Sequence, residues 1–166
     1  MELQWMNTHL TQAEQMFYNN QVPEGLAVLQ NLLYEEPGYA QLHNHLGWAY
    51  LYYTQDMAQA ELHLKLAIRF NAAYAPPYLH LGNLLIRLAR YTEALEYLHK
   101  GLHQQQANKV AFLEVLAQVY ELRRDFTNAI KHYKQALVAT TGFETGQLME
   151  GIKRCQKKRW TMLFAF

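Results

Sequence analysis

The sequence has little cysteine, little proline and no long apolar run. Its 166 residues include one cysteine, Cys155, and four prolines. A single cysteine cannot form an internal disulfide, and it fits a reducing compartment. No stretch approaches the roughly 18 apolar residues of a membrane-spanning helix. The N-terminal stretch lacks a basic segment followed by an apolar one, so no signal peptide is expected. These absences predict a soluble, cytoplasmic protein.

Hydrophobic residues make up 51% of the chain, which is enough for a sizeable core and argues against disorder. The net charge is +1, but its distribution is uneven. Residues 1–144 carry a net charge of −3, whereas residues 145–166 carry +4. An asymmetry of this kind can mark a contact surface.

Small residues recur at a fixed interval along the chain. One series runs through Ala13, Gly47, Gly82 and Ala117, at spacings of 34, 35 and 35 residues. A second runs through Gly25, Ala60, Ala94 and Ala129, and a third, of larger residues, through Val22, Met57, Tyr91 and Phe126. Three series with one period indicate an internal repeat.

Each repeat reads as two helices. The first contains a bulky residue, then Leu-small, then a large apolar residue, as in "HNHLGWAY", "YLHLGNLL" and "LEVLAQVY". The second reads small-x3-bulky-x2-small, as in "AELHLKLA", "ALEYLHKG" and "AIKHYKQA". Both spacings keep these residues on one helical face. The short links between them predict antiparallel neighbours.

These motifs resemble the tetratricopeptide repeat (TPR), whose pattern is W-x2-L-G-x2-Y, then A-x3-F, then P. The resemblance covers residues 6 to 141. The sequence departs from the pattern at the bulky first position, which is never Trp, and at the closing proline, which is present only at Pro37. The resemblance implies an all-α, right-handed solenoid of about four helix pairs. The expected repeats are 6–39, 40–74, 75–108 and 110–143 in a single domain, followed by a capping helix over 145–160.

The glycines inside two helices have a packing explanation. A glycine in a helix costs about 1 kcal/mol relative to alanine. Gly47 and Gly82 occupy equivalent repeat positions, where a missing side chain would let the second helix approach closely. Apolar burial at roughly 25 cal/mol per Å² offsets that cost.

The resemblance also implies a concave groove lined by the first helix of each pair. The positions carried over from the family include Leu10, Tyr18 and Leu122. The groove residues on which the binding hypothesis depends are Glu14, Phe17, Asn44, Trp48, Leu51, Tyr52, Leu79, Asn83, Ile86, Arg87, Glu114, Gln118 and Glu121. Several are apolar or aromatic, and such residues anchor interfaces. Alternatively, neighbouring helices could cover some of them.

Some family members hold a peptide's terminal carboxylate with Lys, Asn and Arg. At the matching positions of this chain only Asn44 fits that chemistry. We therefore expect an amphipathic helix or an extended apolar segment as the partner.

The C-terminal stretch "GQLMEGIKRCQKKRW" predicts a further helix. Leu148, Ile152 and Cys155 form an apolar stripe, and the cations fall on the other side. The stretch could cap the solenoid. The tail-contact candidates are Lys153, Arg154, Lys157, Lys158, Trp160 and Phe164. They could fold back on the last repeat, join a second copy or touch an anionic membrane surface, and membrane is the less favoured of these.

No catalytic, metal or cofactor site is expected. His99 and His103 lie one helical turn apart, but no third ligand is placed beside them, and zinc needs at least three protein ligands. Cys155 lies beside cations that could depress its pKa, yet it has no catalytic partner. No phosphate loop or nucleophile motif occurs.

The sequence thus predicts a non-enzymatic, cytoplasmic scaffold or adaptor that binds a protein or peptide in its groove. The competing interpretation is a self-associating or membrane-peripheral adaptor that acts through the basic, apolar tail. Nucleic acid is disfavoured as a partner, because no aromatic residues are interleaved with the cations as stacking platforms.

Overall fold

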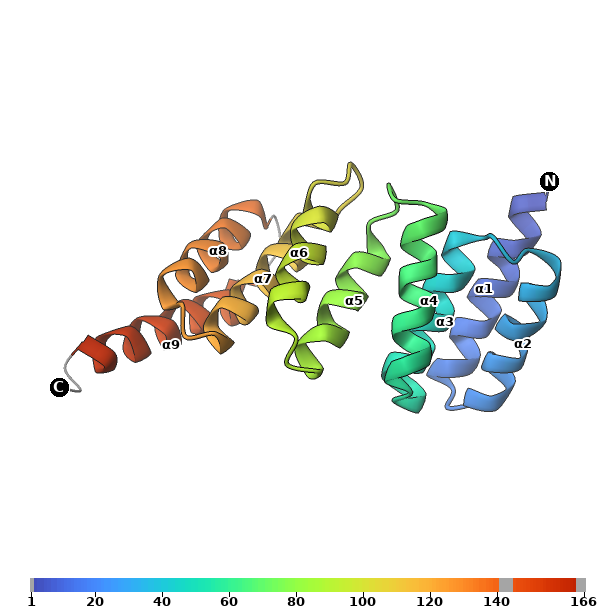
Figure 1. The fold of residues 1–166 in the computed structure, drawn as a ribbon, viewed down its shortest axis with the longest axis horizontal. Helices are drawn as coiled ribbons and strands as arrows, with labels where there is room; N and C mark the ends of the chain where they lie inside the picture. The colour runs from blue at the N-terminus through green and yellow to red at the C-terminus, as the bar shows by residue number, and fades with distance from the viewer. Residues whose placement is uncertain (1, 141–144, 164–166) are drawn as a thin grey trace. The chain divides into compact units, whose positions relative to one another are not determined.

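The computed structural model describes residues 2–140 and 145–163, and within these ranges every regular element is a helix (Figure 1). The helices are α1 (Glu2–Tyr18), α2 (Val22–Glu35), α3 (Ala40–Ala49), the π-helix η1 (Tyr50–Thr54), α4 (Met57–Phe70), α5 (Pro76–Arg87), α6 (Tyr91–Leu102), α7 (Lys109–Leu122), α8 (Phe126–Ala139) and α9 (Thr145–Leu163). The predicted all-α architecture of four helix pairs and a terminal helix is confirmed. Helix α9 extends three residues beyond the predicted end.

The chain forms two compact units, Met1–Leu84 and Leu85–Phe166, and the boundary falls inside α5. In the first unit, α1 packs on α2 and α3 packs on α4. In the second, α7 contacts both α6 and α8, and α8 packs on α9. Sequential helices are therefore neighbours within each unit, as short links require.

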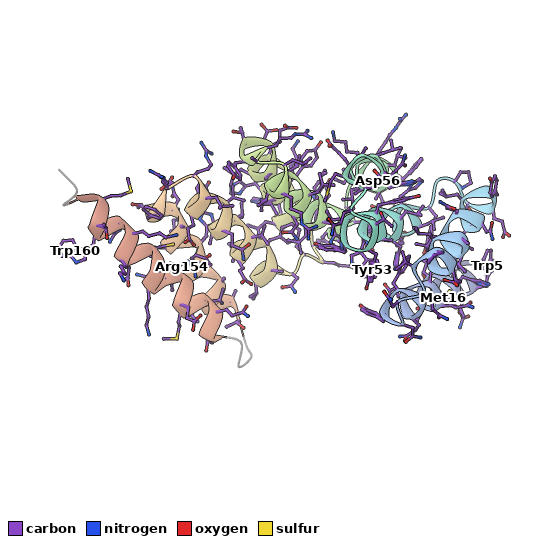
Figure 2. The ribbon with its side chains drawn as sticks, turned by 90° about the horizontal axis from the view of Figure 1, so that it is seen from below. Trp5, Met16, Tyr53, Asp56, Arg154 and Trp160 are labelled. Carbon is purple, nitrogen blue, oxygen red and sulfur yellow. The ribbon has the colours of Figure 1, made fainter. Side chains whose placement is uncertain are left out.

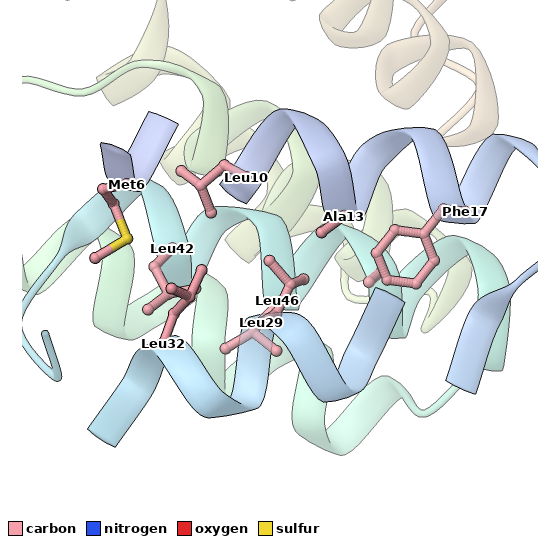
Figure 3. Close-up of a cluster of buried hydrophobic side chains, with 9 residues drawn as sticks. Met6, Leu10, Ala13, Phe17, Leu29, Leu32, Leu42 and Leu46 are labelled. Carbon is pink, nitrogen blue, oxygen red and sulfur yellow. The ribbon is translucent and has the colours of Figure 1, made fainter. Parts of the chain in front are cut away.

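The core of the first unit lies between α1, α2 and α3. In Figure 3, Leu10 and Phe17 of α1 face Leu29 of α2 and Leu46 of α3. Each of these side chains is at most 3% exposed. Ala13 lies among them and is fully buried, as its place in the first series of small residues predicts.

The core of the second unit includes residues of the terminal helix. Leu148 and Cys155 of α9 are buried in one cluster with Ala117 of α7 and Tyr133 of α8, and Ile152 packs against it. The predicted apolar stripe of α9 is thus confirmed. Gly151 lies in the same contact, because an added Cβ would come within 2.7 Å of the Tyr133 ring.

The position of Gly47 confirms its predicted packing role. A Cβ added there would lie 2.5 Å from Leu64 Cγ and 3.1 Å from the Leu64 backbone nitrogen on α4. The backbone of α4 cannot move away as a side chain could. The missing Cβ therefore sets how closely α3 and α4 pack.

A fourth series with the repeat period lies at the end of each first helix. Asn20, Gln55, Ala89 and Arg124 all have left-handed backbones, with φ of 61°, 59°, 56° and 60°. After α5, the amide of Ala89 donates to Ile86 O and that of Arg90 to Leu85 O. This pair of bonds defines a Schellman motif, and α1 and α7 end with the corresponding bonds. The second pair differs, because η1 precedes Gln55.

Candidate functional site

An aromatic cluster lies where α3 continues into η1, beside the end of α1. The Trp48 ring lies 5.0 Å from that of Tyr53, 5.5 Å from that of Phe17 and 6.2 Å from that of Tyr18, measured between centroids. Phe17 is buried, whereas Tyr18 is 67% exposed. The cluster is therefore anchored in the core and opens to solvent at Tyr18.

The π-helix η1 follows α3 and contains both buried and exposed side chains. Within η1, Leu51 is fully buried and Tyr52 is 36% exposed. Tyr53 is partly buried beside Trp48. Short π-helical turns inside α-helices occur frequently at functional sites. Three consecutive residues of η1 thus differ in exposure: Leu51 is buried, Tyr53 is partly buried and Tyr52 is exposed.

Polar contacts connect the same helices. His45 Nε2 lies 2.8 Å from Glu14 Oε1, which joins α3 to α1. Asn83 Nδ2 donates to the Tyr52 hydroxyl at 3.3 Å, which joins α5 to η1. His80 is near both Tyr52 and His45, and burial, followed by His45, lowers its pKa to about 4. His80 is therefore neutral at pH 7.

Burial corrects part of the predicted groove. Phe17, Asn44 and Leu51 are 2%, 6% and 0% exposed, so none is accessible to a partner in this conformation. Phe17 fills the contact with α2, where a Cβ on Gly25 would lie 3.0 Å from its ring. Leu51 lies four residues after Gly47, as Phe17 lies four residues after Ala13, and both side chains of this repeat position face the core. Leu10 is buried as well.

The other predicted groove residues reach the surface to different extents. In the first unit these are the exposed Tyr52 and the partly exposed Glu14, Trp48, Leu79 and Asn83. In the second unit Arg87 and Gln118 are exposed, and Ile86, Glu114 and Glu121 are partly exposed. We name the first-unit set of Glu14, Tyr18, Trp48, Tyr52, Leu79 and Asn83 the aromatic face.

Glu121 is occupied by the terminal helix. Arg154 of α9 donates from Nε and Nη2 to its two oxygens at 2.7 and 2.8 Å, and Lys158 Nζ donates at 2.8 Å. The Glu121 side chain is 10% exposed. Its pKa falls to about 2, chiefly because of the hydrogen bond from Arg154. Glu121 therefore binds α9, although the sequence analysis placed it among the groove residues available to a partner.

The tail candidates divide into two groups. Arg154 and Lys158 hold α9 against α7, whereas Lys153, Lys157 and Trp160 are exposed, and Trp160 stands at the far end of α9 in Figure 2. Phe164 lies outside the described residues. Burial raises the pKa of Cys155 to about 11, so the thiolate suggested by the neighbouring cations is not favoured.

Histidines form a buried contact that sequence reasoning missed. His43 Nδ1 lies 2.9 Å from His63 Nδ1, and His43 Nε2 lies 2.9 Å from Pro37 O. The carbonyl requires a donor, so His43 carries its proton on Nε2 and accepts from Nδ1–H of His63. His63 has a pKa lowered to about 4 by burial and then by His43. The only sequence signal was the place of His43 at the bulky first position of its repeat.

No metal-binding cluster occurs among the described side chains: three or more His, Cys, Asp or Glu residues nowhere come together as ligands. His99 and His103 are instead linked within α6, where His103 Nδ1 lies 2.7 Å from His99 O. Within the described ranges, no helix combines the length and apolar character needed to span a membrane.

Comparison with known proteins identifies the repeats. Models of the tetratricopeptide repeat match residues 75–105 and 113–145. No curated protein matches the sequence significantly. The family matches fall on α5–α6 and α7–α8, the helix pairs where the sequence pattern places the third and fourth repeats. Residues 75–105 and 113–145 of this chain are therefore tetratricopeptide repeats.

Solved structures share its fold. A thermophilic TPR protein of Thermus thermophilus is 22% identical with a TM-score of 0.72, covering 92% of this chain and 80% of that one. Pseudomonas aeruginosa PilF is 16% identical with a TM-score of 0.78, covering 96% and 74%. Yeast Tom70 is 15% identical with a TM-score of 0.77, covering 93% of this chain but 33% of its own length. At these identities the likeness establishes the fold alone.

Proposed function

We propose that this chain is a non-enzymatic protein-interaction module that binds a helix or an extended apolar segment of a partner protein on its aromatic face. The observation that carries the proposal is the exposure of two tyrosines. Tyr18 packs against the half-buried Trp48, which buried Phe17 supports, and Tyr52 packs against His80. Aromatic side chains that are already held by packing lose little conformational entropy when a partner binds. Such side chains contribute most of the binding energy at many interfaces.

The composition of the aromatic face supports an apolar rather than a strongly charged partner. Its carboxylate, Glu14, is already paired with His45, and Asn83 is hydrogen-bonded to Tyr52. The rest of the face is aromatic or aliphatic. A partner would therefore gain most of its binding energy by covering rings and Leu79, with Glu14 and Asn83 at the polar edge.

The test is a quantitative pull-down with Tyr18→Ser/Tyr52→Ser. The control is Tyr34→Ser, which makes the same substitution at an exposed tyrosine of α2 outside the aromatic face. We expect the double variant to lose the partners that wild type and the control retain. A partner retained at wild-type level by the folded double variant would refute binding at this face.

A direct readout uses the indole of Trp48. In a Trp5→Phe/Trp160→Phe background, Trp48 is the single tryptophan of the chain. A purified partner should shift its emission on binding, because it would exclude water from the ring. An unchanged Trp48 spectrum with a saturating partner would place the contact elsewhere.

The cytoplasmic location, the absence of catalysis and the exclusion of nucleic acid remain predictions. Self-association or membrane contact through the tail is the competing proposal. The ion pairs of Arg154 and Lys158 favour a capping role for this part of α9, because they direct two of its cations to Glu121.

A further inference from the structure

A basic and apolar hollow lies within the second unit, between the end of α7, the start of α8 and the last turns of α9. Its volume is about 650 Å³, within the roughly 300–1,000 Å³ of ligand-binding clefts. It is lined by Glu121, Leu122, Arg124, Phe126, Arg154, Lys157, Lys158, Thr161 and Met162. We call it the α7–α9 pocket. It is separate from the aromatic face, which belongs to the first unit.

The charges of the pocket are unbalanced. Its lining has four cations and one carboxylate. Arg154 and Lys158 are paired with that carboxylate, Glu121. Among the described residues, Arg124 and Lys157 have no ion pair, and both are exposed. The lining therefore has an excess positive charge at two side chains that no carboxylate of the described residues neutralises.

Apolar surface lies directly beside these cations. Leu122 is 51% exposed and Met162 is 49% exposed, while Phe126 is almost buried at 7%. Leaving Leu122 and Met162 in water is unfavourable at roughly 25 cal/mol per Å². An occupant that combines carboxylates with aliphatic or aromatic side chains would satisfy both parts of the lining.

We propose that the α7–α9 pocket binds an acidic amphipathic segment of a partner protein, with Asp or Glu side chains paired to Arg124 and Lys157 and with apolar side chains on Leu122 and Met162. The excess positive charge of the lining favours an acidic partner segment. Phe126, the aromatic ring of the lining, is too buried to act as a stacking platform for nucleic acid bases. A hollow with cations on opposite elements, α9 and the link after α7, suits an inserted segment better than a flat lipid surface.

The experiment uses the full chain and a fluorescein-labelled peptide of Glu, Leu and Phe, patterned so that the acidic side chains share one face of a helix. Fluorescence anisotropy measures its affinity. The pocket variant is Arg124→Glu/Lys157→Glu. The matched control is Lys131→Glu/Lys134→Glu, which makes the same change of charge at two exposed lysines of α8 outside the pocket.

We expect micromolar binding by wild type, a loss of at least tenfold in the pocket variant and a change of less than threefold in the control. Leu122→Ser, which keeps every charge, should also weaken binding, and this separates insertion from simple charge attraction. Circular dichroism melting of each variant verifies folding. Binding that is absent in wild type, or equal in the pocket variant and the control, would overturn the proposal.

Two further measurements distinguish the other occupants. Sedimentation with phosphatidylserine vesicles tests a membrane surface, and concentration-dependent sedimentation velocity tests a second copy of this chain. Vesicle binding or self-association that the pocket variant abolishes, with no peptide binding, would overturn the proposal in favour of that occupant. The Tyr18→Ser/Tyr52→Ser variant should retain peptide binding, so failure here is distinguishable from failure of the aromatic face.

Discussion

Arg154 and Glu121 form a two-point ion pair between helices, across a sequence separation of 33 residues. Nε and Nη2 of Arg154 each donate to one oxygen of Glu121, at 2.7 and 2.8 Å. The Tyr133 hydroxyl lies 3.4 Å from the same carboxylate. One acidic side chain of α7 thus connects α9 to the last helix pair, because Lys158 also donates to it.

The first prediction concerns this carboxylate. Glu121→Gln keeps its shape but removes its charge, so Arg154 and Lys158 lose their counter-ion. We expect a loss of about 1–2 kcal/mol in the free energy of unfolding, because both cations are half exposed and partly rehydrate. Thermal melting should show a decrease of roughly 2–8 °C. Glu114→Gln on the same helix is the control, and equal melting of the two variants would contradict the prediction.

The second prediction concerns pH and the buried histidines of the first unit. His63 and His80 have pKa values lowered to about 4 in the folded chain, against an ordinary value of 6.5. Between these values the unfolded chain takes up protons that the folded chain does not. The free energy of unfolding therefore decreases as the pH falls from about 6.5 towards 4, and the loss at pH 5 is roughly 2 kcal/mol per histidine.

Denaturant unfolding at pH 7 and pH 5 measures this slope. Glu121 does not contribute between these values, because the carboxyl is ionised in the folded chain above about pH 2 and mostly ionised in the unfolded chain at pH 5. His63→Gln keeps a donor for His43 Nδ1 but cannot titrate. We expect a shallower pH dependence for this variant than for wild type. The same slope in both would assign the effect to other groups.

Much of the fold could be predicted from the sequence because the repeat period is a direct consequence of packing. Gly47 recurs as Gly82 one period later, and the structure places Gly47 against Leu64 of the paired helix. The apolar stripe of α9 was likewise readable, since Leu148 and Cys155 lie two turns apart on one face. The repeat period and the helical spacing of apolar residues are enough to predict these contacts.

The candidate site was only partly predictable, because repeat positions alone do not show which side chains the chain's own helices cover. Leu51 was placed in the groove, but it is fully buried, as is Phe17 at the equivalent position of α1. Glu121 was assigned to a partner because the α-helical pattern cannot show that α9 docks beside α7. A usable signal did exist, since Arg154 and Lys158 are four residues apart and share one face of a basic helix.

The third prediction concerns Gly47. Gly47→Ala improves intrinsic helix propensity, but its Cβ would overlap Leu64 and approach the α4 backbone at 3.1 Å. We expect the clash to dominate and the free energy of unfolding to fall by roughly 1–3 kcal/mol. Gly146→Ala is the control, because nothing lies within 4 Å of its added Cβ. Urea unfolding of both variants should give opposite signs, and a Gly47 variant as stable as wild type would exclude the tight contact.

The fourth prediction concerns the left-handed residue after α5. Ala89 has φ of 56°, a conformation that is strained for a residue with a Cβ and easy for glycine. Its amide and that of Arg90 already make the Schellman hydrogen bonds, so Ala89→Gly relieves strain without loss of a contact. We expect stabilisation by about 0.5–1 kcal/mol, measured by urea unfolding. Ala27→Gly, at an exposed position inside α2, should destabilise by roughly 1 kcal/mol. Destabilisation of similar size by both substitutions would mean that the left-handed conformation at Ala89 carries no strain.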